Sequence, residues 1–227
     1  MICGIDISES QGIIDWETIV NSDVGFAFIR ATKKDHAKPG VLPDNNLYLN
    51  GRGAIENKIS LGFYHSWNPD LPGDDQAREF IKIINDNLLV DYNSYERKLP
   101  PALWLEESKI SDSDLESEIH KFIGVIMKCY GPKPIIFTSK KFWTKYLSDR
   151  SIWINKYEHA LILWVKEHTQ QFPGVFYPFV NSKFWQFTNE ARIPGISGNV
   201  NLNWFFGTRY EINTLDIHQW KNLKTYS

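Results

Sequence analysis

Two carboxylates stand at the ends of short apolar runs and are the first candidates for chemistry. Asp6 closes the run that begins at Ile2, and Glu106 follows the run from Ala102 to Leu105. A protonated carboxyl can donate a proton to a leaving oxygen, while an ionised one stabilises positive charge that develops on a reacting carbon. Each residue also has an ordinary structural interpretation: Asp6 as a cap for the following loop, and Glu106 as a surface carboxylate.

Aromatic side chains form a second set of candidates. The chain contains 9 Trp, 10 Tyr and 14 Phe residues. Flat apolar faces of this kind bind sugar rings, although large cores also absorb aromatic residues. Four of them fall at or near the ends of expected strands, where they would either form sugar-stacking walls or belong to the core and its rim: Tyr64, Trp67, Trp164 and Trp185.

The sequence lacks the signature motifs of several other kinds of catalytic site. It contains no Gly-x-Ser-x-Gly elbow, P-loop or Gly-x-Gly-x-x-Gly motif, so serine hydrolase and nucleotide-binding interpretations have no support. Cys3 and Cys129 form no Cys-x-x-Cys pair and no Cys/His cluster with zinc spacing. Two buried thiols are therefore expected rather than a disulfide, and no metal or cofactor is expected.

Short apolar runs alternate with segments of helical period, a pattern typical of βα units and a parallel sheet. The clearest helices are expected at Gly73–Leu89 and Ser113–Tyr130, and helical signals weaken after Ser139–Asp149. Eight strands with five intervening helices would form an incomplete βα barrel, but the periodicity alone fits an open doubly wound sheet equally well. The first seven strands are expected at Ile2–Ile7, Gly25–Ala31, Ser60–Ser66, Ala102–Glu106, Pro134–Thr138, Ala160–Val165 and Lys183–Phe187.

Several short segments match a known family in their order along the chain. The opening segment, MICGIDISESQGIIDW, places Asp6 ahead of Ser8 and Gln11-Gly12. It is followed in order by Arg30-Ala31-Thr32 with Asp44 and Asn50, Gly62-Phe63-Tyr64-His65, Gln76-Ala77, Pro101 to Glu106, Leu163-Trp164-Val165, Trp185-Gln186-Phe187-Thr188, and Gly195 to Gly207. Together these segments resemble the strand motifs of glycoside hydrolase family 25, the lysozyme-type N-acetylmuramidases of the Chalaropsis type.

This resemblance implies both a fold and an activity. The fold is an α/β domain, a single flattened, incomplete TIM-like (β/α)5(β)3 barrel over residues 1–207, with residues 208–227 as an extension packed on it. The activity is hydrolysis of the β-1,4 bond between N-acetylmuramic acid and N-acetylglucosamine, with Glu106 as the general acid and Asp6 as its charged partner across the barrel mouth. The residues that would bind the glycan are Tyr64, Trp67, Trp104, Trp164, Trp185, Gln186 and Asn201.

Two positions depart from the family pattern where carboxylates should stand. Trp104 replaces an aspartate two residues before the family's glutamate, and Asn201 replaces the aspartate of the last strand. Because side chains alternate along a strand, Trp104 and Glu106 share one face, and Glu107 on the other face is not expected to replace the missing acid. Loss of one preorganised electrostatic partner typically slows a reaction about 100- to 1000-fold. A catalytically inactive glycan-binding or assembly module is therefore the alternative to a muramidase.

Net charge and the length of the apolar stretches limit the classes of partner and the cellular locations that the sequence supports. Lys and Arg number 25 against 27 Asp and Glu, giving a net charge of −2, so the footprint of a nucleic-acid or anionic-membrane binder is absent. No apolar stretch is long enough to span a bilayer, and the opening residues lack the features of a signal peptide. The protein is expected to be made in the cytoplasm and to act on the cell wall after release or export, or else to have an upstream signal outside this sequence. The expected partner is the peptidoglycan glycan strand, and no pattern bears on oligomeric state.

Overall fold

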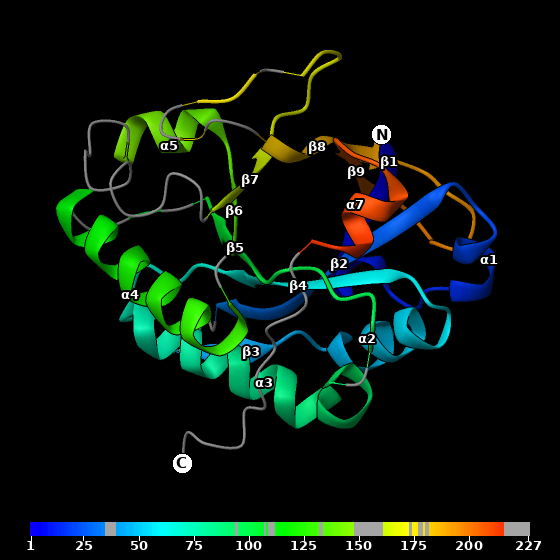
Figure 1. Cartoon of the computed structure of the whole chain (residues 1–227), viewed down its shortest axis with the longest axis horizontal. Helices are drawn as coiled ribbons and strands as arrows, with labels where there is room; N and C mark the ends of the chain where they lie inside the picture. The colour runs from blue at the N-terminus through cyan, green and yellow to red at the C-terminus, as the bar shows by residue number, and fades with distance from the viewer. Residues whose placement is uncertain are drawn as a thin grey trace.

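The computed structural model shows a closed β-barrel flanked by helices (Figure 1). It describes residues 1–34, 40–93, 95–106, 108, 112–131, 134–147, 161–172, 174–176, 179 and 182–215. Pairing between the first and last strands of the ring closes the barrel, which excludes the open doubly wound sheet. Within the described residues the strands follow one another around the barrel as β1 (Ile2–Ile7), β9 (Val200–Phe205), β8 (Ser182–Ala191), β7 (Ile162–Lys166), β6 (Ile135–Thr138), β5 (Ala102–Leu105), β4 (Ser60–Ser66) and β2 (Val24–Lys34).

Helices and strand directions identify the barrel as TIM-like. All the barrel strands run parallel to their neighbours except β9, which is antiparallel to both β1 and β8. The expected α/β barrel is therefore confirmed. In Figure 1 the longer helices lie along one side of the barrel. They are α2 (Leu47–Glu56), α3 (Gly73–Asn93) and α4 (Asp112–Tyr130), with shorter elements at η1 (Glu9–Gln11), α1 (Trp16–Val20) and α5 (Lys140–Tyr146).

Alternation along the strands sorts the apolar side chains into two layers. One layer fills the inside of the barrel and includes Phe28, Phe137 and Phe184, while the other lies between barrel and helices. Gly62 is required on the inner side, because a Cβ there would lie 2.2 Å from the Phe28 ring. The barrel interior is thus a packed core, and a ligand must bind at the barrel mouth rather than inside.

The observed elements differ from the expected ones mainly at their ends. Strand β2 continues to Lys34, β8 continues to Ala191, and α3 continues to Asn93. The short strand β3 (Val41–Pro43) was not expected; it pairs with β2 outside the closed ring. Its length explains the omission, because three residues are too few for a period-two pattern to stand out.

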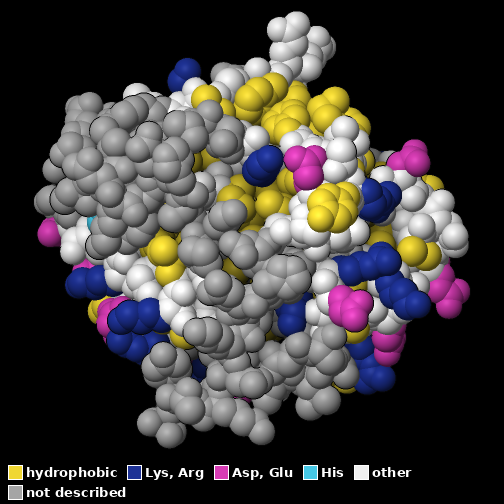
Figure 2. Space-filling view, in the orientation of Figure 1, with side chains coloured by type: hydrophobic (Ala, Val, Ile, Leu, Met, Phe, Trp, Pro, Cys, Tyr) yellow, Lys and Arg dark blue, Asp and Glu magenta, His cyan; other side chains and the backbone are white. Residues whose placement is uncertain are grey.

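The described part of the C-terminal extension packs on one end of the barrel. It contains α7 (Arg209–Asn213), whose Ile212 is fully buried in the inner apolar layer. Ser60, the first residue of β4, donates from Oγ to Asn213 Oδ1 at 2.8 Å. Helix α7 therefore covers the end at which the parallel strands begin, and Figure 2 shows apolar side chains on this face over β8 and around α7. The boundary between barrel domain and extension at residue 207 remains a prediction. Residues 216–227 lie outside the described part.

Two further sequence expectations concern the cysteines and the membrane. Cys3 and Cys129 are free thiols, each partly rather than fully buried, and burial raises the pKa of both. Among the helices within the described ranges, none combines the length and the apolar character that a membrane crossing needs.

Candidate active site

The carboxyl ends of the parallel strands bring a group of polar side chains to one mouth of the barrel. Asp6 ends the inward row of β1, Lys166 ends β7, Gln186 lies on β8, and Glu106 directly follows β5. Two pockets of about 440 and 100 Å³ open among them. Trp104 lines both pockets, with Glu106 in the larger one and Asp6 in the smaller one. The two candidate carboxyls thus line two pockets that share Trp104.

Asp6 is held by three side-chain amides. Gln186 Nε2 and Asn203 Nδ2 donate to Asp6 Oδ1 at 2.9 and 2.7 Å, and Asn201 Nδ2 donates to Oδ2 at 2.7 Å. The amides reach the carboxyl because β9 runs beside β1, with Asn201 directly opposite Asp6. Burial raises the pKa of Asp6, while the three amides and the nearby positive charge of Lys166 oppose this rise. The site therefore keeps Asp6 in one fixed orientation as a buried acceptor.

Glu106 is the more exposed carboxyl, and Lys166 contacts it directly. Half of the Glu106 side chain is accessible to solvent, and its Oε1 forms an ion pair with Lys166 Nζ. The same ammonium group lies 4.9 Å from the centre of the Trp104 ring. This ion pair bears directly on acid catalysis, because an oxygen that accepts from Lys166 must leave that partner before it can donate a proton.

Several of the expected glycan-binding residues line these pockets. Tyr64, Gln186 and Asn201 line the smaller pocket, and Trp67 lines the larger one. Tyr64 and Trp67 are both nearly covered, at 5% exposure each, so each offers an edge rather than an open ring face. Burial raises the pKa of Tyr64, which keeps its hydroxyl protonated as a hydrogen-bonding group.

Two expected sugar-binding tryptophans have a different role. Trp164 is 0% exposed in the barrel interior, where it stacks on Phe137 with ring centres 3.8 Å apart. Its Nε1 donates to Asn203 Oδ1 at 2.8 Å and so orients an amide that binds Asp6. Trp185 points to the outer layer, where its Nε1 donates to the Glu167 carbonyl oxygen at 2.7 Å. Of the two alternatives that the sequence left open for Trp164 and Trp185, burial of both rings by protein favours the core over sugar-stacking walls.

Sequence reasoning missed three residues of this site. Lys166 contacts Glu106, Asn203 binds Asp6, and His168 Nε2 lies 2.9 Å from Gln186 Oε1. A signal for two of them was present. Lys166 lies two positions after Trp164, and Asn203 two positions after Asn201, so alternation places each pair on one face. For Lys166 the pattern to notice was a strand that ends with a charged residue on its inner face.

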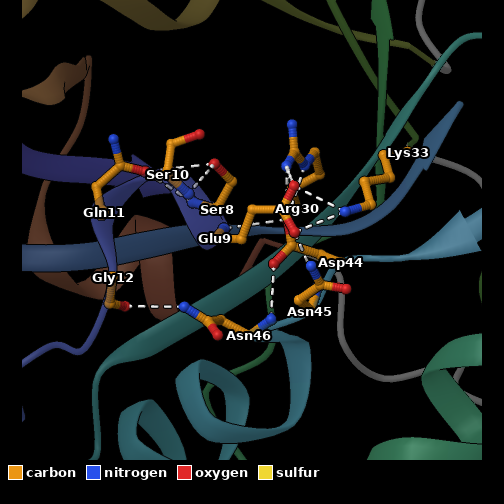
Figure 3. A network of polar contacts seen from close by, with 10 residues as sticks. All are labelled: Ser8, Glu9, Ser10, Gln11, Gly12, Arg30, Lys33, Asp44, Asn45 and Asn46. Carbon is orange, nitrogen blue, oxygen red and sulfur yellow. Dashed lines mark hydrogen bonds and ion pairs between the residues drawn. The ribbon is translucent and has the colours of Figure 1, made fainter. Parts of the chain in front are cut away.

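A network of charged side chains forms the rim of the larger pocket (Figure 3). Arg30 donates from Nε to Asp44 Oδ2 at 2.8 Å and from a terminal nitrogen to Glu9 Oε1 at 3.2 Å. Lys33 Nζ contacts Glu9 Oε2 at 2.6 Å. The Glu9 backbone N–H donates to the same oxygen of Asp44 at 3.1 Å, which ties η1 to the residue that follows β3. The network therefore holds the segment after Asp6 in place.

We expect Asp44→Asn to destabilise the protein substantially. The Asp44 side chain is fully buried, and Arg30 beside it is 16% exposed, so the change leaves a mostly buried cation with only its longer contact to Glu9. Breaking such a pair costs about 3 kcal/mol in the free energy of unfolding, to be measured by urea denaturation. Glu56→Gln is the control, because it removes a carboxylate from an exposed pair with Arg52 and should cost less than about 0.5 kcal/mol. Equal losses in the two variants would contradict the structural role assigned to Asp44.

The described residues also bear on metal binding. They contain no group of three or more His, Cys, Asp or Glu side chains arranged to hold a metal ion.

The chain is similar to known proteins in both sequence and fold. Residues 5–196 match the profile of the glycosyl hydrolases family 25. The chain is 30% identical over 220 residues to "Uncharacterized protein YegX" of Escherichia coli O157:H7, covering 93% of this chain and 72% of that protein. It is 24% identical over 212 residues to Lysozyme M1 of Streptomyces globisporus, covering 90% of this chain and 68% of that protein. The crystal structure of the bacterial lysozyme from Streptomyces coelicolor has a TM-score of 0.79 at 23% identity, covering 95% of this chain and 96% of that one.

Proposed function

Since this chain belongs to the glycosyl hydrolases family 25, we propose that it hydrolyses the β-1,4 bond between N-acetylmuramic acid and N-acetylglucosamine in peptidoglycan. One observation carries the proposal: Asp6 and Glu106 lie at the same mouth of the barrel, each lining a pocket that Trp104 also lines. This is the end of the barrel at which enzymes of such folds have their active sites. The protein would meet its substrate after release or export to the cell wall.

The mechanism assigns different roles to the two carboxyls. Protonated Glu106 gives its proton to the glycosidic oxygen as the bond from that oxygen to the anomeric carbon breaks. The acetamido oxygen of the same sugar attacks that carbon and forms a cyclic, positively charged intermediate. Water then adds to the anomeric carbon and reopens the ring that the acetamido group had formed. Ionised Glu106 takes up the proton that the water releases.

Asp6 and Asn201 act on the positive charge and on the acetamido group. Asp6 supplies a fixed negative charge, which stabilises the charged intermediate through space. Because Asn201 Nδ2 donates to Asp6, its Oδ1 is the atom that can accept a hydrogen bond from the acetamido N–H. An amide orients this group without neutralising its charge, so the proposed enzyme is slower than relatives that carry an aspartate there.

A glycan-binding module that does not cleave is the second candidate. Three observations favour it: Trp104 in place of an acid, neutral Asn201, and the direct ion pair between Glu106 and Lys166. The fold and the pockets are the same for both candidates, so the distinction is purely one of chemistry.

The decisive experiment is to incubate the purified protein with peptidoglycan and identify new reducing ends. The digest is reduced with borohydride and analysed by mass spectrometry, with a muramidase of known activity as the positive control. New N-acetylmuramitol ends would support the proposal, and N-acetylglucosaminitol ends would assign a different bond. Co-sedimentation with peptidoglycan without any new ends would favour the binding module.

A further inference from the structure

Lys166 contacts both Glu106 and Trp104, two residues that a bound sugar would also contact. Its ammonium group forms an ion pair with Glu106, lies against the Trp104 ring, and is close enough to Asp6 to favour its ionised form. Its side chain is 24% exposed and lines the smaller pocket. A glycan that stacks on this face of Trp104 or reaches this oxygen of Glu106 must therefore displace Lys166.

The other cations of the cleft have carboxylate partners that the proposed reaction does not touch. Arg30 pairs with Asp44, Lys33 pairs with Glu9, and Lys34 pairs with Asp70. Lys166 differs, because its partner Glu106 is the residue that must carry a proton for catalysis. Asp6 is a poor replacement partner, since its two oxygens already accept three amide hydrogen bonds.

A protonated Glu106 thus leaves Lys166 in the cleft without its counter-ion, and the bound glycan can supply a new one. We propose that Lys166 is a specificity-determining residue that binds a carboxylate carried by the glycan strand. The carboxylate is either that of a free lactyl group on muramic acid or one in an attached peptide. Ammonium–carboxylate contacts of this kind are among the stronger hydrogen bonds. The inference rests on the proposed function, because it assumes that the cleft binds a glycan.

Three ligands of equal sugar length test this role and separate the two sources of the carboxylate. The first is a neutral tetramer of N-acetylglucosamine, the second is a peptide-free peptidoglycan tetrasaccharide with free lactyl groups, and the third is its peptide-bearing form. Dissociation constants are measured by calorimetry for the wild type and Lys166→Met. We expect the wild type to favour at least one charged ligand over the neutral one by about tenfold. In Lys166→Met this preference should disappear, with tighter binding of the neutral ligand.

Two further variants separate the role of charge from that of shape. Lys166→Arg keeps the positive charge and should keep most of the preference. Lys145→Met is the matched control, because Lys145 also lies over an aromatic ring, 4.6 Å from the centre of Tyr146, but on α5. It should leave all three dissociation constants unchanged. Added salt should weaken the preference of the wild type, a measurement that needs no variant.

The outcomes distinguish this inference from the function on which it rests. An equal preference for charged ligands in the wild type and Lys166→Met would overturn the role of Lys166 while leaving a glycan-binding cleft. Equal affinity of the wild type for all three ligands would overturn it as well. If the wild type binds none of the three ligands and releases no reducing ends, the proposed function itself is wrong, and the role of Lys166 falls with it.

Discussion

Replacing Glu106 with glutamine should reduce the release of new reducing ends from peptidoglycan by about 100- to 10,000-fold, the range typical for loss of a general acid. Glutamine keeps the shape of glutamate but has no acidic proton to give to the glycosidic oxygen. The fold should survive, because half of the Glu106 side chain is exposed and its ion pair with Lys166 lies near the surface. Product release is measured by chromatography of reduced muropeptides, with circular dichroism to verify the fold.

The control for this variant is Glu56→Gln, which makes the same chemical change on α2, at an exposed pair with Arg52. It should retain the wild-type rate. Glycan affinity should fall little in Glu106→Gln, since the loss concerns proton donation rather than binding. A wild-type rate in the Glu106 variant would remove this residue from the mechanism and leave the cleft without its expected acid.

Asp6 and the parallel strands were predictable because their signals are local, whereas the closed barrel was implied only by the resemblance to the family. The apolar run of β1 ends at Asp6, and short apolar runs followed by helices predict parallel strands wherever they occur. The amides around Asp6 were harder to assign, because Gln186 and Asn203 are far from it in sequence and meet it only when β9 pairs with both β8 and β1. Closure of the barrel decides this arrangement, and periodicity does not encode closure.

The tryptophans show why position along a strand does not settle exposure. Trp164 shares the inner face of β7 with Lys166, but it lies two residues deeper, below the level of the mouth. Trp185 lies next to Gln186 on β8 and points to the opposite side of the sheet. Alternation gives the face of a side chain, whereas its depth depends on how far the strand extends beyond the packed interior. The role of Trp104 at the junction of two pockets could not be read from sequence for the same reason.

Placing an acid at each of the two positions where the resemblance implies one, Trp104 and Asn201, should raise turnover. In the double variant Trp104→Asp/Asn201→Asp, a carboxylate can orient the acetamido group and stabilise its positive charge, and each such group is worth about 100-fold or more in rate. The change at Asn201 has a particular consequence, because its amide now donates to Asp6 at 2.7 Å. Two carboxyls at that distance repel each other when both are ionised, so they should share one proton.

The same variant should be less stable, and its stability should depend on pH. Trp104 stacks against Phe137, with ring centres 5.9 Å apart, and loss of a packed tryptophan costs roughly 3 kcal/mol. Burial already raises the pKa of Asp6, and a second carboxyl beside it should raise that pKa further. A raised pKa in the folded state favours folding at low pH, and the benefit is lost as pH rises through the folded-state value. The melting temperature of the double variant should therefore fall further below that of the wild type at pH 7 than at pH 5.

Trp104→Asn, with Asn201 left unchanged, separates the effect of charge from that of space. It opens the same room in the cleft as Trp104→Asp but adds no negative charge. If carboxylates are what the cleft lacks, only the double aspartate variant should gain turnover, by about 100-fold or more over this control, measured as reducing ends per minute. Equal gains in the two would mean that the tryptophan obstructs the substrate mechanically. A folded double variant with no gain, made from an inactive parent, would instead favour the glycan-binding module, because the acids that the resemblance implies would then be present in a cleft that still cannot cleave.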